Sequence, residues 1–110
     1  MIHVAIYQNR RKEYIGFKAS GHAGFGESGK DIVCAAASIL MINTINAVEL
    51  YTSDRTSLFS DEEIGLIDYC IEVSPSEKAE VLLKAMVLGL REIADDENYA
   101  EYIDLTFEEV

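Results

Sequence analysis

The chain has 110 residues, 49% hydrophobic and 26% charged, so it is predicted to fold as a single globular domain over residues 1–110 and not to be disordered. Nine Lys and Arg residues against twenty Asp and Glu residues give a formal net charge of −11. Such an acidic surface repels phosphate backbones, which argues against a nucleic-acid partner and favours a basic peptide or protein.

No pattern for export or for a membrane span is visible. The longest apolar stretch, residues 32–42, is too short to cross a bilayer, and residues 1–4 lack the basic head of a secretory signal. We therefore expect a cytoplasmic protein whose two cysteines, Cys34 and Cys70, are reduced thiols. Two cysteines and two histidines at scattered spacing do not form a zinc pattern, so neither a metal nor a cofactor is expected.

The first half of the chain predicts a hairpin, a loop and a helix. Apolar residues alternate with others on both sides of a polar tip at residues 9–12, which is typical of a β-hairpin over residues 2–20. Residues 21–29 hold four of the seven glycines and are predicted to form a mobile loop. A helix is expected from about Asp31, which can cap it, to about Tyr51.

The second half predicts a second hairpin, a second helix and a closing strand. The hairpin strands are expected at residues 56–59 and 64–73, around a turn at residues 60–63. Residues 74–77, Ser-Pro-Ser-Glu, are typical of a capping box that opens a helix to about Asp95. An apolar stripe follows on that helix at Leu82, Met86, Leu90 and Ile93, and Ile103, Leu105 and Phe107 alternate as a last strand. The order ββαββαβ predicts an α+β fold, a mostly antiparallel or mixed sheet packed against two helices.

A histidine, His22, lies at the start of the glycine-rich segment, and a cysteine, Cys34, follows shortly after its end. Cys34 is expected in the first turn of the central helix, where free backbone N–H groups and the helix dipole favour a thiolate. If the loop folds over the helix start, His22 could reach the sulfur and serve as base, then as acid to the leaving group. The N–H groups around Cys34 would be available to an oxyanion. The arrangement favours a cysteine nucleophile.

A structural interpretation of the same residues stays open. Free cysteine is among the most buried residue types, and Cys34 lies in an apolar helix. Asp31 would then be a plain helix cap, and a lone histidine such as His22 at a strand end carries no function by itself. Cys70 and His3, which lie on predicted strands, are interpreted as structural.

Residues 24–30 also fit the G-x-x-x-x-G-K pattern of phosphate-binding loops, between a strand and a helix. That pattern continues with Ser or Thr, whose hydroxyl binds magnesium, but Asp31 stands there in this chain. Glu27 adds a second negative charge where phosphates would lie. The chain is also short for a parallel nucleotide-binding sheet, so we do not expect a nucleotide site.

Residues 21–24, Gly-His-Ala-Gly, followed by residues 29–36, Gly-Lys-Asp-Ile-Val-Cys-Ala-Ala, and by Ser38 form a specific signature. This signature closely resembles the ribosomal-processing cysteine protease family, Prp. The resemblance extends over essentially the whole chain, including length, acidity and element order, and no motif position departs from it.

The resemblance implies a bacterial cytoplasmic endopeptidase that removes a short N-terminal extension from a large-subunit ribosomal protein. It implies that Cys34 is the nucleophile and His22 its base, with Asp31 as an orienting or capping residue. Gly21 and Ser38 match motif positions and are expected to support the site. It further implies a homodimer and a loop, residues 22–33, that moves to admit substrate. Independently, an acidic enzyme suits a substrate rich in Lys and Arg.

Two other functions remain open from the residues alone. The first is a non-enzymatic assembly factor that binds a basic ribosomal protein and keeps Cys34 in its core. The second is a thiol sensor in which Cys34 is oxidised reversibly. A protease needs both Cys34 and His22, a sensor needs Cys34 alone, and a binding factor needs neither.

Overall fold

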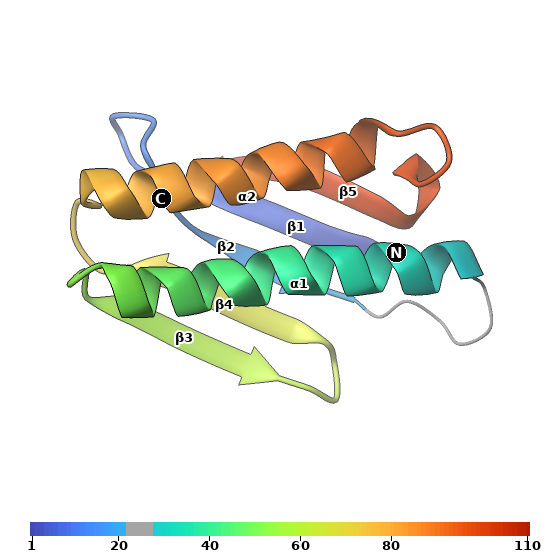
Figure 1. Ribbon diagram of the computed structural model, residues 1–110, viewed down its shortest axis with the longest axis horizontal. Helices are drawn as coiled ribbons and strands as arrows, with labels where there is room; N and C mark the ends of the chain where they lie inside the picture. Colours follow the sequence, from blue (N-terminus) through green and yellow to red (C-terminus); the bar gives the residue numbers. More distant parts are fainter. Residues whose placement is uncertain (22–27) are drawn as a thin grey trace.

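Five strands form one sheet, and two helices lie side by side across one of its faces (Figure 1). The computed structural model describes residues 1–21 and 28–110, and for residues 28–31 the backbone alone. The elements are β1 (Ile2–Gln8), β2 (Tyr14–Ser20), α1 (Ser28–Tyr51), β3 (Thr56–Asp61), β4 (Leu66–Ile71), α2 (Glu77–Asp95), the short 3-10 helix η1 (Ala100–Tyr102) and β5 (Ile103–Glu109). The predicted α+β class and ββαββαβ order are confirmed.

The sheet is mixed, with strand order β3-β4-β2-β1-β5. The two hairpins are antiparallel, and β4 also pairs antiparallel with β2, which joins them into one sheet. After α2 the chain returns to the sheet at the edge opposite β3. There β5 pairs parallel with β1, beginning at the pair Ile2–Ile103. The two edge strands are therefore β3 and β5.

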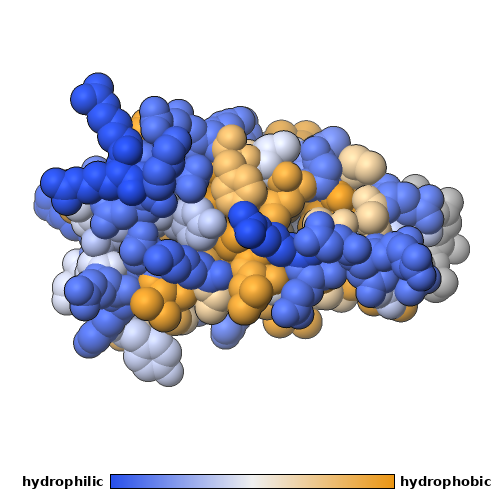
Figure 2. Space-filling view, turned by 90° about the horizontal axis from the view of Figure 1, so that it is seen from above, coloured by the Kyte–Doolittle hydropathy of each residue, from blue (hydrophilic) through white to orange (hydrophobic). Residues whose placement is uncertain are grey.

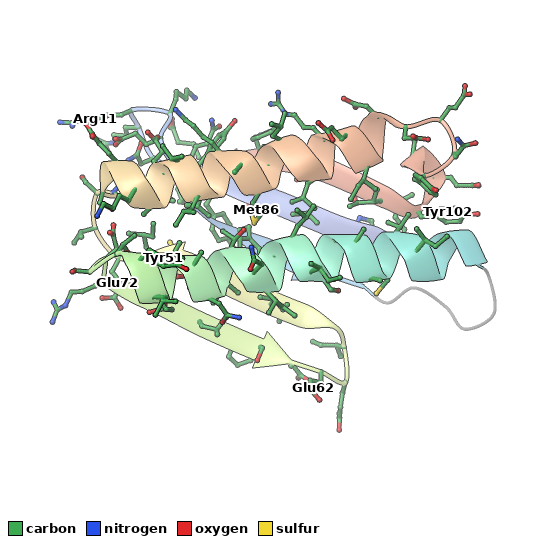
Figure 3. The ribbon with its side chains drawn as sticks, viewed as in Figure 1. Arg11, Tyr51, Glu62, Glu72, Met86 and Tyr102 are labelled. Atoms are coloured by element: carbon green, nitrogen blue, oxygen red, sulfur yellow. The ribbon has the colours of Figure 1, made fainter. Side chains whose placement is uncertain are left out.

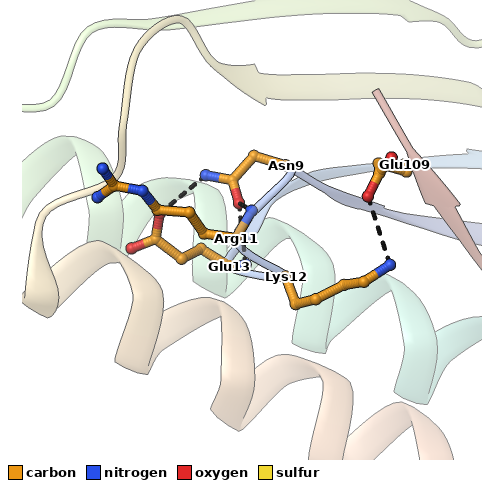
Figure 4. A network of polar contacts seen from close by, with 5 residues as sticks. All are labelled: Asn9, Arg11, Lys12, Glu13 and Glu109. Carbon is orange, nitrogen blue, oxygen red and sulfur yellow. Dashed lines mark hydrogen bonds and ion pairs between the residues drawn. The ribbon is translucent and has the colours of Figure 1, made fainter.

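The turn between β1 and β2 forms where the polar tip predicted it (Figure 4). The Asn9 side-chain oxygen accepts the backbone N–H groups of Arg11 and Glu13, each at 3.0 Å. Asn9 Nδ2 donates to Glu13 Oε1 at 2.9 Å, and Lys12, at φ 65°, lies 3.4 Å from the Glu109 carboxylate on β5. Two backbone hydrogen bonds also close the turn, from the Asn9 N–H to the Glu13 carbonyl oxygen at 3.1 Å and from the Lys12 N–H to the Asn9 carbonyl oxygen at 3.0 Å. The asparagine therefore stabilises the turn through both its backbone and its side chain.

The core fills the space between the helices and the covered face of the sheet. Alternate residues of each strand point to that face, as the predicted period of two requires. Phe17 of β2 and Tyr69 of β4 are fully buried there, with ring centroids 5.9 Å apart. The helices contribute inward-facing residues, chiefly Val33, Ala37, Met41, Ile45 and Val48 of α1 and Ala79, Leu83, Met86, Val87 and Leu90 of α2.

Helix α1 begins at Ser28, earlier than predicted. Asp31 is therefore the fourth helical residue and not the N-cap, and residues 28–33, expected in a moving loop, are helical. Residues 32–51 of α1 have a mean hydropathy of 1.7 and are long and apolar enough to cross a membrane by length and composition. A core helix meets the same criterion, and one side of α1 lies in the core described above.

Helix α2 starts on a different serine from the one predicted. Ser76, not Ser74, is the N-cap, and its hydroxyl oxygen accepts the Ala79 backbone N–H at 3.1 Å. Both oxygens of Asp54 accept hydrogen bonds from Ser76, one from its N–H at 2.8 Å and one from its hydroxyl at 2.6 Å. Pro75 consequently precedes the helix and does not occupy its first turn.

The inner face of α2 is wider than the predicted stripe. Met86 and Leu90 are buried as expected. Leu82 and Ile93 are only half-buried, and Leu83 is more deeply buried than either of these two.

The surface of the molecule is mostly hydrophilic on the side seen from above, over α2 and β5. Hydrophobic side chains form a band across the middle of this side (Figure 2).

The β3–β4 hairpin has a different turn from the predicted one. Strand β3 continues to Asp61, and β4 covers only Leu66–Ile71, so the turn lies at residues 62–65. Gly65, at φ 61°, adopts the left-handed conformation there and faces no strand partner. Val73 was expected to be the last residue of this strand, but it lies beyond β4 and is exposed.

Candidate active site

A cavity of about 450 Å³ lies between the middle of α1, from Cys34 to Asn46, the β3–β4 hairpin and the end of β2. This volume is typical of sites that bind a small ligand or a few side chains of a larger one. Most of the wall is hydrophobic, from Ile2, Ala19, Ala37, Met41, Ile42, Ile45, Leu58, Leu66 and Ile67, and polar groups come from Ser20, Cys34, Ser38, Asn46, Ser60, Asp61 and Glu62.

Cys34 is half-buried in α1 and contributes to the cavity wall. It is the seventh residue of the helix, so it lies in the second turn and not in the first. The backbone N–H groups that lack a helical partner belong to the first four residues, 28–31. The expectation that N–H groups around Cys34 are free for an oxyanion is therefore wrong, because the helix already uses them.

Ser38 lines the same cavity, one turn further along α1. Residues four apart share a helix face, so Ser38 follows Cys34 on the side that faces the cavity. Both side chains are half-buried. The structure thus brings the expected nucleophile and its expected neighbour to one wall.

Gly21 forms another part of the wall, directly after β2. Its φ of 101° lies in the region that L-residues rarely adopt, and a Cβ atom there would collide with the Met1 carbonyl oxygen. Both constraints require glycine at this position. The backbone of Gly21 therefore takes a conformation at the end of β2 that a residue with a side chain would not easily adopt.

Two of the expected site residues are not placed. His22 lies outside the described residues, as does the side chain of Asp31. Asp31 belongs to the first turn of α1, one helical turn before Cys34. The pairing of Cys34 with His22 accordingly stays a prediction from the sequence.

Sequence reasoning missed the contribution of the β3–β4 hairpin. Leu58 and Ser60 of β3 line the cavity, together with Asp61 at the end of the strand and Glu62 in the turn. Glu62 lies at the hairpin tip, at the same end of the molecule as the start of α1 (Figure 3). The run of acidic residues at 61–63 was a visible signal, but only the pairing of β4 with β2 brings it beside Cys34.

Cys70 and His3 lie away from the cavity. Cys70 follows Tyr69 on β4 and therefore points to the uncovered face of the sheet. Burial, and then the nearby carboxylates of Asp68 and Glu72, raise the pKa of the Cys70 thiol, which disfavours a nucleophilic thiolate. His3 Nδ1 lies 2.5 Å from an oxygen of Asp104 and links β1 to β5. Both positions suit the structural interpretation.

No metal-binding group of three His, Cys, Asp or Glu side chains occurs within the part of the chain that the structure describes. The polar residues that line the cavity are one cysteine, three serines, one asparagine and two acidic residues.

Comparison with known proteins places the chain in a family. A family model described as cysteine protease Prp matches residues 1–104. A ribosomal processing cysteine protease Prp of Staphylococcus aureus is 33% identical over 107 residues, which cover 97% of this chain and 99% of that protein. Crystal structures of the essential ribosomal processing protease Prp from S. aureus superpose with TM-scores of 0.88 and 0.86, at 30% and 31% identity. Each covers 98% of this chain and 100% of that one; the first contains a substrate peptide and the second a covalently linked product peptide. The chain therefore belongs to the cysteine protease Prp family and is a cysteine peptidase, as its motif residues predicted.

Proposed function

We propose that this chain, acting as one domain over residues 1–110, is an endopeptidase that removes the short N-terminal extension of a bacterial large-subunit ribosomal protein in the cytoplasm. The observation that carries the proposal is the position of Cys34 on the wall of a cavity large enough for peptide side chains. Its S. aureus relative is called a ribosomal processing protease and binds peptides, one of them covalently linked.

In the proposed reaction, His22 takes the proton of the Cys34 thiol, and the sulfur attacks the carbonyl carbon of the scissile bond. The C–N bond breaks as His22 returns the proton to the leaving amine, which leaves the acyl group on Cys34 as a thioester. Water, deprotonated by His22, then attacks the thioester. Thiolate leaves, and the enzyme is regenerated with its proton.

Three further residues are proposed to assist this pair. Ser38 is proposed to donate a hydrogen bond near the reacting sulfur, since it lies one turn from Cys34 on the cavity side. Asp31 is proposed to orient His22 from the first turn of α1. Gly21 supplies the left-handed backbone that leads into His22.

Charge supports a basic substrate. The net charge is −11, and two acidic residues, Asp61 and Glu62, are among the residues that line the cavity. The cationic β1–β2 turn lies at the opposite end of the molecule from the β3–β4 turn (Figure 1). Lys and Arg side chains of a ribosomal protein are therefore attracted to the end of the molecule that holds Cys34.

A homodimer and a moving segment complete the proposal. Large hydrophobic side chains such as Ile39 and Leu50 of α1 and Leu88 of α2 are exposed, and burying them against a second copy would be favourable. Sedimentation at micromolar concentration tests this, and a monomer would refute it. Gly21, Gly24 and Gly26, which precede α1, support a segment that moves to admit substrate. Combining Gly24→Ala with Gly26→Ala should slow peptide turnover and leave the labelling of Cys34 by a small reagent unchanged.

The test is incubation of the protein with the precursor ribosomal protein, followed by mass spectrometry. We expect one cut near the precursor N-terminus, no cut by Cys34→Ala, and a rate lower by roughly 100-fold for His22→Ala. Cys70→Ala is the matched control, because it removes the other thiol away from the cavity and should cut normally. Binding of the precursor without cleavage by the wild type would instead favour an assembly factor. Cleavage that needs Cys34 and not His22 would refute the pair.

A further inference from the structure

Strand β3 is an edge of the sheet, and its backbone offers hydrogen-bonding groups on the outer side. Among the described residues it pairs with β4 alone, in a register without shifts. The Glu72 N–H donates to the Arg55 carbonyl oxygen at 2.9 Å, just before this ladder. Because hydrogen-bonded pairs alternate in an antiparallel ladder, Thr56, Leu58 and Ser60 direct their N–H and C=O groups away from β4.

This edge lacks the features that normally prevent strand pairing. Charged residues and proline protect exposed edges, and β3 has neither between Thr56 and Ser60. Leu58 and Phe59 are 54% and 60% exposed. The opposite edge differs, because β5 carries three acidic residues along its length.

Two of the three β3 residues whose backbone groups point away from β4, Leu58 and Ser60, also line the cavity. Leu58 and Ser60 pair with Tyr69 and Ile67, which face the helices, so their side chains point to the cavity wall shared with Cys34. Along α1 the cavity extends from Cys34 to Asn46. At the rise of an α-helix this is about 18 Å, the length of about five extended residues.

We propose that the substrate peptide adds to the sheet as a further strand along β3. Its backbone pairs with the free N–H and C=O groups of Leu58 and Ser60, and alternate side chains enter the cavity. The scissile bond lies at the Cys34 end. Affinity then comes from the backbone of about five residues, and side-chain selection acts at every second position. This inference rests on the proposed function in taking the peptide as substrate.

The first test is a backbone methylation scan. The probe is a synthetic ten-residue peptide spanning the bond cut in the ribosomal-protein precursor, with one amide N-methylated in each analogue. Affinities are measured with the Cys34→Ala protein, so that cleavage does not interfere. We expect alternate positions over about five residues to lose affinity by about tenfold, since each loses one hydrogen bond to β3, and the positions between them to change little.

The second test removes one donor from the protein. Ser60→Pro deletes the outward N–H, and Ser60→Ala deletes the same hydroxyl but keeps the N–H, so their difference isolates the backbone bond. We expect Ser60→Pro to bind the unmodified peptide about tenfold more weakly than Ser60→Ala, at similar melting temperatures. A scan without alternation, or equal affinities of two folded variants, would overturn strand addition while leaving cleavage intact. A wild-type protein that neither binds nor cuts the unmodified peptide would overturn both proposals.

Discussion

Gly21→Ala tests whether the backbone after β2 is as constrained as the structure indicates. At φ 101° an L-residue pays about 1–2 kcal/mol relative to glycine. The new Cβ would also collide with the Met1 carbonyl oxygen, and forcing an atom into occupied space costs about 1–3 kcal/mol. Together we expect a loss of about 3 kcal/mol in the free energy of unfolding, or about 12 °C in Tm.

The assay is urea unfolding at 25 °C together with a thermal melt. Gly65→Ala is the matched control, since Gly65 has a φ of 61° that an L-residue can adopt at a cost of about 1 kcal/mol. We expect it to lose about 4 °C. If Gly21→Ala proves no less stable than Gly65→Ala, the reasoning about the end of β2 is wrong.

Other predictions concern caps and titrating groups. Ser76→Ala removes the cap of α2 and should lower the unfolding free energy by about 1 kcal/mol, measured by urea unfolding. Burial raises the pKa of Asp54 but hydrogen bonds from Ser76 lower it more, and the net shift is downward. The stability that this shift adds is present above pH 4 and lost in more acidic solution, so Asp54→Asn should flatten the acid limb of the stability profile. Burial raises the pKa of Tyr69 to about 12, so stability should fall between pH 10 and pH 12, and less so in Tyr69→Phe. Iodoacetamide at pH 7 should modify Cys34 faster than Cys70, by peptide mapping, because burial and then nearby carboxylates raise the pKa of Cys70.

The periodic parts of the fold were predictable, but the ends of the elements were not. Alternation in the strands and the apolar stretches of the helices are local signals, and they gave the correct order of elements. The start of α1 differs from the predicted start at Asp31, because the helix extends back through Gly29 to Ser28. Glycine is unfavourable in a helix, and this local preference is outweighed here. The choice of Ser76 over Ser74 as cap depends on Asp54, which is distant in the sequence and contacts Ser76 only in the folded chain.

The candidate site was predictable only where it is local or matches the family motif. The spacing of four between Cys34 and Ser38 implies a shared helix face, and the structure places both on the cavity wall. Leu58 and Asp61 could not be assigned to the site, because that requires the strand order β3-β4-β2-β1-β5. Strand order is set by tertiary packing, which no local pattern encodes.

The central claim, that Cys34 is the nucleophile in the cavity, is tested most directly by an affinity label. A peptide that corresponds to the excised extension, ending in a chloromethyl ketone, is incubated with the wild-type protein, and the modified residue is mapped by mass spectrometry. We expect one label per chain, on Cys34, with loss of peptidase activity in proportion to labelling. A label on Cys70, or full activity in a protein fully labelled at Cys34, would contradict the account.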